Sequence, residues 1–288
     1  MKVLIAVNAY IKNKSQISQA ERIKEELEKS GATAVIERNF DLARIVKRGI
    51  VGGQFDICVF LDKDRVAARL LENCGIRLYN RASAIEVCDD KMLTNIALAN
   101  AGFPVPDCMY APLCYYADAE LNGGFLQSVE KNLGFPLVAK TNYGSLGAGV
   151  FKIDGEKALS DFEREHMLSP HFYQKFIGRG GEDTRVIVVG GKVVCAMRRI
   201  NDGDFRSNIE LGGRGEKVVC GNELETLCTG VAKELRLDYC GVDVLTDTDG
   251  KNYICEVNSN AFFAAAERVC GVNVAAAYAK HILSDFKK

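Results

Sequence analysis

A polar stretch that contains an Asp-Gly dipeptide separates two apolar segments near the end of the chain. The segments are residues 241–245 and 253–258, and the dipeptide is Asp249-Gly250. Asp-Gly between two apolar runs is the strongest short-range signal for a β-hairpin. We therefore predict two antiparallel strands joined by this dipeptide as a two-residue turn.

That turn fixes which side chains meet across the hairpin. Counting back from it sets Asp243 directly across from Glu256, and strand alternation puts Asn258 on the same face. Two facing carboxylates among apolar neighbours repel each other unless something neutralises them. Three oxygen donors suit a hard cation such as Mg²⁺, completed by phosphate oxygens. The alternative is an ordinary hairpin whose carboxylates face solvent.

The composition favours a soluble, globular protein. The chain has 288 residues, 48% of them hydrophobic, and 37 basic residues balance 38 acidic ones. It can form one large or two to three small domains. No basic stripe indicates nucleic acid, and no apolar run approaches the roughly 18 residues of a membrane span. The eleven cysteines include no Cys-x-x-Cys pair, which favours reduced thiols and a cytoplasmic location.

The first third of the chain alternates strands and helices. We expect strands at 3–7, 34–37 and 57–61 and a helix at 65–73, which together indicate a parallel sheet. The apolar run at the start is too short for a signal peptide and reads as the first strand. No glycine fingerprint follows this strand, so a dehydrogenase that uses a dinucleotide is disfavoured.

A helix over residues 89–101 and an extended linker over 103–107 end this first region. The helix is expected to bury an apolar face of Met92, Leu93, Ile96 and Ala99. Beyond the linker, short helices alternate with short strands and Gly-rich turns, which predicts α+β structure with antiparallel sheets. A hairpin predicted at Gly190-Gly191 would set Asp183 opposite Arg198.

Two glycine-rich loops carry further polar residues. A strand ending at Lys140 leads into residues 141–149, which hold Gly144, Gly147 and Gly149, and a second strand follows. Glycines let backbone N–H groups approach phosphates, although such a loop can also be a flexible turn. Because it joins two strands, it is neither a P-loop nor a dinucleotide fingerprint. A second loop, residues 203–215, is a candidate lid or a plain surface loop.

The order and spacing of these motifs resemble the ATP-grasp ligases. More narrowly, they are similar to the RimK-like branch, which adds glutamate or related amino acids to a carboxyl group. The resemblance covers nearly the whole chain, and Gly-Asp-Phe-Arg-Ser-Asn is specific to that branch. The motifs are Lys140 with residues 144–149, residues 203–208, residues 241–243 and residues 256–258.

The resemblance implies an ATP-grasp fold that mixes α/β and α+β parts. A parallel αβ (pre-ATP-grasp) domain would span residues 1–88. A central subdomain with the Gly-rich loop would span 89–176, and a C-terminal subdomain with the metal site would span 177–288. The last two would clamp ATP between them.

The resemblance also implies a role for each matched residue. The phosphates of ATP would be contacted by Lys91, Lys140, Gly144, Ser145, Gly147 and Gly149. The rest of the nucleotide would meet Gln174, Lys175, Phe176, Ile177 and Asp183. The catalytic groups at the γ-phosphate and the activated carboxylate would be Arg206, Asn208 and Lys140. Two Mg²⁺ or Mn²⁺ ions would be held by Asp243, Glu256 and Asn258.

Two departures from the family pattern concern the substrates. Related enzymes usually continue Ala-Ser-Pro-Gly after Asn258, whereas this chain has Ser259-Asn260-Ala261-Phe262. That region helps to form the substrate side, so the acceptor stays open. Gln174 and Lys175 replace a common acidic residue near the adenine.

The implied reaction joins a carboxylate to an amine. Transfer of the γ-phosphoryl group of ATP gives an acyl phosphate, and the amine then displaces phosphate. The partners would be a small-molecule or peptide carboxylate and an amino acid, without nucleic acid or membrane, and related enzymes are often homo-oligomers. The alternatives are a ligase that uses another nucleophile and an ATP-binding regulatory protein without turnover.

Overall fold

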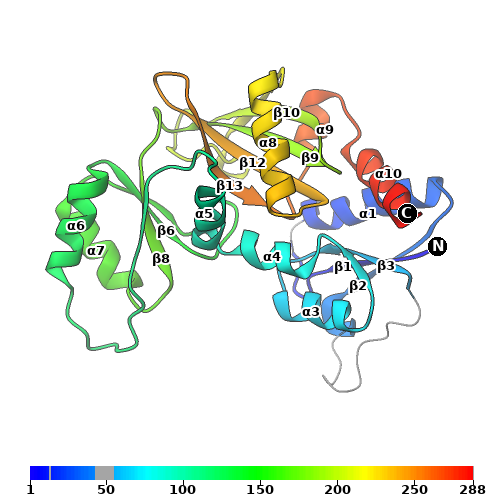
Figure 1. Ribbon diagram of the computed structural model, residues 1–288, viewed down its shortest axis with the longest axis horizontal. Coiled ribbons are helices and arrows are strands. Elements are labelled where there is room, and N and C mark those ends of the chain that lie inside the picture. Colours follow the sequence, from blue (N-terminus) through cyan, green and yellow to red (C-terminus); the bar gives the residue numbers. More distant parts are fainter. Residues whose placement is uncertain (13, 43–54, 288) are drawn as a thin grey trace.

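The computed structural model describes residues 1–12, 14–42 and 55–287, and it contains three sheets (Figure 1). The N-terminal sheet is parallel, in the order β2-β1-β3-β4, as the alternation of strands and helices predicted. Its strands are β1 (Lys2–Val7), β2 (Thr33–Arg38), β3 (Ile57–Leu61) and β4 (Arg77–Tyr79). The helices around it are α1 (Lys14–Lys29), α2 (Asn39–Leu42), α3 (Arg65–Asn73) and α4 (Ala82–Asp89).

Both faces of this sheet are covered. One face packs on α1 through Ala20, Ile23 and Leu27, and the other packs on α3 and α4. A parallel sheet buried on both sides requires strands that are apolar throughout, as β3 is. The carboxyl ends of its strands therefore provide the polar edge, and the functional cavity begins there.

The central sheet is antiparallel, in the order β5-β8-β6-β7, and forms its own core with two helices. Along β6, Leu137 and Ala139 point toward the helices, so Val138 and Lys140 point toward the cavity. The elements are β5 (Cys108–Tyr110), α6 (Gly123–Leu133), β6 (Leu137–Thr141), β7 (Val150–Ile153), α7 (Glu156–His166) and β8 (His171–Lys175).

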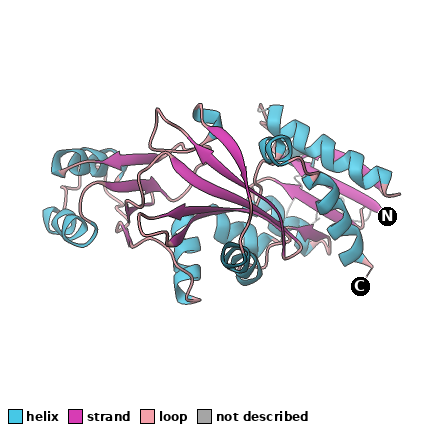
Figure 2. Ribbon diagram, turned by 90° about the horizontal axis from the view of Figure 1, so that it is seen from above, coloured by secondary structure: helices cyan, strands magenta, loops and turns pink. Residues whose placement is uncertain are grey.

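The C-terminal sheet is also antiparallel, in the order β11-β10-β9-β12-β13. One of its faces shares a continuous core with the N-terminal sheet, and the other packs on α8. Its elements are β9 (Glu182–Val189), β10 (Lys192–Ile200), β11 (Arg214–Val218), α8 (Asn222–Glu234), β12 (Tyr239–Thr246), β13 (Asn252–Asn258), α9 (Ala264–Cys270) and α10 (Val274–Phe286). Figure 2 shows the central unit extending to one side, away from both termini.

Each of the three predicted segments contains one sheet. The shared core joins the first and the last segment, and residues 43–54 of the first lie outside the described part of the chain. The division at 88 and 176 stays a prediction. Within the described ranges, none of the helices combines the length and apolar character that a bilayer crossing requires.

The predicted buried face of the helix after residue 89 was wrong. The helix is α5 (Lys91–Asn100), capped by Asp90, and Leu93 and Ile96 on the predicted face are exposed. Its buried residues are Lys91, Thr94, Asn95 and Leu98. The polar members of this set turn toward β13, because the tertiary environment, and not the apolar stripe, decides which face is covered.

Candidate functional site

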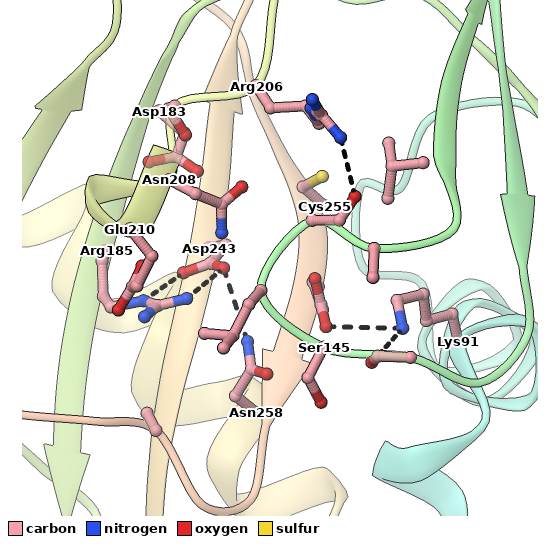
Figure 3. Close-up of a pocket in the computed structure, with 18 of the residues that line it drawn as sticks. Lys91, Ser145, Asp183, Arg185, Arg206, Asn208, Glu210, Asp243, Cys255 and Asn258 are labelled. Carbon is pink, nitrogen blue, oxygen red and sulfur yellow. Dashed lines mark hydrogen bonds and ion pairs between the residues drawn. The ribbon is translucent and has the colours of Figure 1, made fainter. Parts of the chain in front are cut away.

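A cavity of about 320 Å³ lies where the three sheets meet. Its walls come from the carboxyl ends of β1 and β3, the Gly-rich loop, the loop after β10 and the β12–β13 hairpin. Figure 3 shows side chains from these segments pointing toward one another. All the predicted site residues except Gly149 line this cavity: Lys91, Lys140, Gly144, Ser145, Gly147, Gln174, Lys175, Phe176, Ile177, Asp183, Arg206, Asn208, Asp243, Glu256 and Asn258.

The predicted pairing of Asp243 with Glu256 is confirmed, although the predicted turn was wrong. Thr246 pairs with Asn252, and the Asp247 backbone N–H donates to Lys251 O at 3.0 Å, so residues 248–250 form the loop. This shifts the register by one residue. A β-bulge next to Glu256 shifts it back.

Asp243 is buried and held by two arginines. Arg185 donates to both of its oxygens at 2.7 Å, and Arg199 Nη2 lies 3.0 Å from Oδ2. Asn258 Nδ2 donates to Asp243 Oδ2 at 3.4 Å. Burial alone would raise the pKa of Asp243, but the two arginines outweigh burial and lower the pKa. Asp243 therefore stays ionised at neutral pH.

The residues on the hairpin face offer two carboxylates and one amide to a cation. Glu256 Oε1 lies 3.7 Å from Lys91 Nζ, and the Glu256 side chain is 26% exposed. Among the described residues, no three His, Cys, Asp or Glu side chains gather into a metal-binding group. The donor set fits Mg²⁺, which is usually bound by one or two carboxylates together with phosphate oxygens and water.

Two lysines approach this face from the central part of the chain. Lys91, on α5, is buried and donates to Gly144 O at 2.9 Å. Burial lowers its pKa although Glu256 opposes this. Lys140, at the end of β6, is 6% exposed, and its Nζ lies 3.5 Å from Cys255 Sγ. Within the described residues no carboxylate lies within 4 Å of Lys140 Nζ, so this charge is available to an anionic ligand.

The Gly-rich loop needs glycine for steric reasons, as Gly147 and Gly149 show. Gly147 has φ +78°, and a Cβ there would lie 3.1 Å from Leu211 Cδ1 and 3.2 Å from Asn208 Oδ1. Gly149 has φ +74°, and a Cβ there would collide with Thr141 at 2.1 Å. Gly149 thus lets the loop fold back on β6, while Gly147 allows the loop after β10 to approach closely.

The loop after β10 docks on the Gly-rich loop through Arg206. Arg206 Nη1 donates to Gly147 O at 3.0 Å, and Asp204 accepts from the same guanidinium. The Asp204 contact raises the pKa of Arg206, so the side chain stays cationic. Figure 3 shows Arg206 reaching across the cavity. Closing these two loops over a ligand would exclude water.

The predicted pairing of Asp183 with Arg198 was wrong. Asp183 lies opposite Arg199, because the β9–β10 register shifts by one residue between Val193 and Cys195. Arg199 Nε donates to Asp183 Oδ1 at 2.7 Å, and Nη2 contacts both Asp183 and Asp243. Arg199 is 3% exposed and therefore links two buried carboxylates.

Sequence reasoning missed both arginines of this network. The spacing Asp183-x-Arg185 on a strand puts both side chains on one face, and this period of two could have identified Arg185. Arg199 follows Arg198 directly, and only the bulge decides which of the two faces the cavity. Cys255 and Glu210 also line the cavity, and no sequence signal marked them.

This arrangement, a cavity between antiparallel sheets with a Gly-rich hairpin on one wall and paired carboxylates on the other, belongs to the ATP-grasp fold. A RimK domain ATP-grasp protein from Sphaerobacter thermophilus aligns with a TM-score of 0.73 and 20% identity, over 98% of this chain and 99% of that one. D-alanine–D-alanine ligase from Bacillus anthracis, complexed with ATP, aligns with a TM-score of 0.75 and 19% identity, over 100% and 97%.

Residues 88–282 match the RimK-like ATP-grasp domain, and the chain belongs to that family. It is 35% identical over 228 residues to β-citrylglutamate synthase B from Danio rerio and to N-acetylaspartylglutamate synthase A from Homo sapiens, covering 77% of this chain and 54% and 56% of those proteins. It therefore spans little more than half of these relatives. It is 34% identical over 220 residues to a probable α-L-glutamate ligase from Xanthomonas euvesicatoria pv. vesicatoria, covering 74% and 71%.

Proposed function

We propose that this protein is an ATP-dependent carboxylate–amine ligase that forms an amide bond through an acyl phosphate. The observation that carries the proposal is the convergence of Asp243, Glu256, Lys140 and Arg206 on one cavity, in a member of a family whose relatives are named as synthases and ligases. A nucleotide-binding protein without turnover would not require these groups together. The proposed ligase needs ATP, and the cysteines of this chain are expected to stay reduced. Both features favour a cytoplasmic location.

In this proposal Asp243, Glu256 and Asn258 hold two Mg²⁺ ions, for which Mn²⁺ can substitute. Bound metal would neutralise charge on the β- and γ-phosphates during phosphoryl transfer. Arg185 and Arg199 fix the Asp243 carboxylate, since both of its oxygens accept from guanidinium groups. Asn258 then presents its amide beside that carboxylate.

Lys140, Lys91 and Arg206 supply the remaining positive charge. Lys140 is proposed to contact a nucleotide phosphate, because it is buried on the cavity wall beside the Cys255 thiol and, among the described residues, no carboxylate pairs with it. Lys91 and Arg206 now donate to backbone oxygens of Gly144 and Gly147, and we propose that they turn to phosphate oxygens when ATP binds. Gln174, Lys175, Phe176 and Ile177 would line the adenine end, and Asp183 would serve the nucleotide site.

The substrates are proposed from the names of the relatives. These names point to L-glutamate as the amine and to citrate or N-acetyl-L-aspartate as the acceptor. A peptide carboxylate is a further candidate acceptor. The loop of Asn260, Ala261 and Phe262 lines the cavity and departs from the family pattern, so it is the proposed determinant of the acceptor.

Incubation with ATP, Mg²⁺, L-glutamate and each acceptor tests the proposal. We expect phosphate release that depends on both substrates, together with an amide product of the corresponding mass. Cell extract with isotopically labelled glutamate extends the search to other acceptors. Tight ATP binding without any phosphate release or conjugate, across the panel and the extract, would favour the nucleotide-binding alternative.

A further inference from the structure

One carboxylate on the cavity wall differs from the others. The cavity is lined by Asp62, Glu182, Asp183, Glu210, Asp243 and Glu256. Four of these have a cationic partner, and Asp62 accepts hydrogen bonds from Asn8 and Asn39. Glu210 has neither a hydrogen bond nor an ion pair with any residue in the described ranges. Glu210 is exposed, and of the six carboxylates it is the one without such a partner in those ranges.

The position of Glu210 places it at the reacting end of the cavity. It lies in the 3₁₀ turn Ile209–Leu211, two residues after Asn208 and in the same loop as Arg206. In Figure 3 Glu210 lies on the same side of the view as Asn208 and Asp243. The contact of this loop with Gly147 ties the position of Glu210 to the Gly-rich loop.

The charges of the cavity explain why such a carboxylate is needed. Seven lysine and arginine side chains line the cavity, and they suit a triphosphate and a carboxylate substrate. An amino acid at neutral pH brings an ammonium group, which these cations repel. Its binding requires a carboxylate that no arginine or lysine has already neutralised.

We propose that Glu210 binds the ammonium group of the amino-acid substrate and so positions the amino acid in the cavity. This inference rests on the proposed function. It assigns a residue to the amino-acid substrate. Neither the family resemblance nor the hairpin argument had assigned one. Asp62 is the less suitable site because neutral donors already occupy both of its oxygens.

The test compares two ligands that differ in the ammonium group. L-glutamate and N-acetyl-L-glutamate are titrated by calorimetry into the protein with Mg²⁺ and a non-hydrolysable ATP analogue. The wild type should bind L-glutamate about tenfold or more tightly, as a charge-assisted hydrogen bond implies. Glu210→Gln should lose this preference, whereas Glu120→Gln, which changes an exposed glutamate away from the cavity, should keep it. Preference retained in Glu210→Gln, abolished by Asp62→Asn, or absent in the wild type overturns the inference.

A second measurement separates this inference from the proposed function. Hydroxylamine is largely uncharged at neutral pH, so it traps an acyl phosphate as a hydroxamate without an ammonium site. With ATP, Mg²⁺ and an acceptor carboxylate, wild type and Glu210→Gln should form hydroxamate at similar rates. Hydroxamate from both with an unchanged glutamate preference would overturn only the role of Glu210. No hydroxamate, phosphate or conjugate from the wild type would overturn the ligase proposal itself.

Discussion

Arg185 donates through Nε and Nη2 to the two oxygens of Asp243, with both contacts at 2.7 Å. The planar guanidinium fork matches a carboxylate, so the pair fixes the orientation of Asp243 as well as its charge. The pair joins β9 to β12 at a buried point next to the cavity. A proposed metal ligand is thereby held in place before any ligand arrives.

Arg185→Leu should lower the free energy of unfolding by about 3 kcal/mol, since it removes one partner of a buried ion pair. Arg199 still contacts Asp243, which keeps the loss at the lower end of the range for such pairs. Urea denaturation measures the effect. Arg198→Leu is the matched control, because Arg198 is 42% exposed and its ion pairs are worth about 1 kcal/mol or less. Equal losses in the two variants would contradict the special role of Arg185.

Glu256→Gln should abolish ligation while it leaves the fold intact. The Glu256 side chain is 26% exposed, and its ion-pair distance to Lys91 is 3.7 Å, so we expect a stability change of about 1 kcal/mol or less. Loss of the carboxylate weakens the proposed metal site, and excess Mg²⁺ or Mn²⁺ should recover part of the activity. Full activity in this variant at ordinary Mg²⁺ would remove Glu256 from the metal site.

Arg206→Ala should reduce kcat more than it reduces the affinity for ATP. Its guanidinium reaches the Gly-rich loop from the neighbouring loop and is proposed to act on the transferring phosphoryl group. Steady-state kinetics together with direct ATP titration separate the two effects. Parallel losses of similar size would assign Arg206 to ground-state nucleotide binding.

The architecture could be read from the sequence because its signals are local. Apolar runs bounded by turn residues predicted strands in all three sheets, although not β4, β5 or β11, and the motif spacing indicated the family. Register was harder, because a β-bulge adds a residue without changing the apolar pattern. In β9–β10 one bulge moved Arg199, and not Arg198, opposite Asp183. In β12–β13 the predicted turn was wrong by one residue, and a bulge shifts the register back by one. Asp243 therefore still pairs with Glu256.

The residues around the proposed metal site depend on contacts between distant segments. Lys91 follows Asp90 in α5. The apolar stripe of this helix led to a wrong prediction of its buried face. Arg185 meets Asp243 because β9 pairs with β12, and the two strands are far apart in the sequence. Side chains buried by tertiary packing against their own preference are the ones that sequence pattern alone does not identify.

The stability of the central unit should depend on pH through Glu163 and His171. Nε2 of His171 lies 2.9 Å from Oε2 of Glu163, and Tyr173 also donates to this carboxylate. Burial alone would lower the pKa of His171, but Glu163 outweighs it and raises the pKa above 6.5. The protonated His171 therefore stabilises the fold fully below pH 6.5, and this contribution is lost as the pH rises through the folded-state pKa.

The same contact acts in the opposite direction on Glu163. Burial would raise its pKa, but His171 and Tyr173 lower it below 4.5, so its contribution is lost as the pH falls through the folded-state pKa. Urea denaturation across pH 5 to 9 should show a decline above about pH 6.5 that His171→Gln flattens. His166→Gln, which leaves the Glu163–His171 contact in place, should retain the decline. An identical slope in wild type and His171→Gln would refute the assignment.

A contact between the N-terminal unit and the Gly-rich loop provides a last prediction. The Arg65 guanidinium lies over the Tyr143 ring, 5.0 Å from its centroid, and Nη1 donates to the Tyr143 hydroxyl at 3.4 Å. Tyr143 directly precedes Gly144, so this contact should hold the loop closed while an acyl phosphate is present. Arg65→Ala should raise the ratio of ATP hydrolysed to amide formed several-fold, because a looser loop admits water. Arg65→Lys keeps the cation–π contact, so its ratio of ATP hydrolysed to amide formed should fall between the ratios of the wild type and of Arg65→Ala. Phosphate release and the amount of product from mass spectrometry give this ratio. An unchanged ratio in Arg65→Ala would mean that the loops close without this contact.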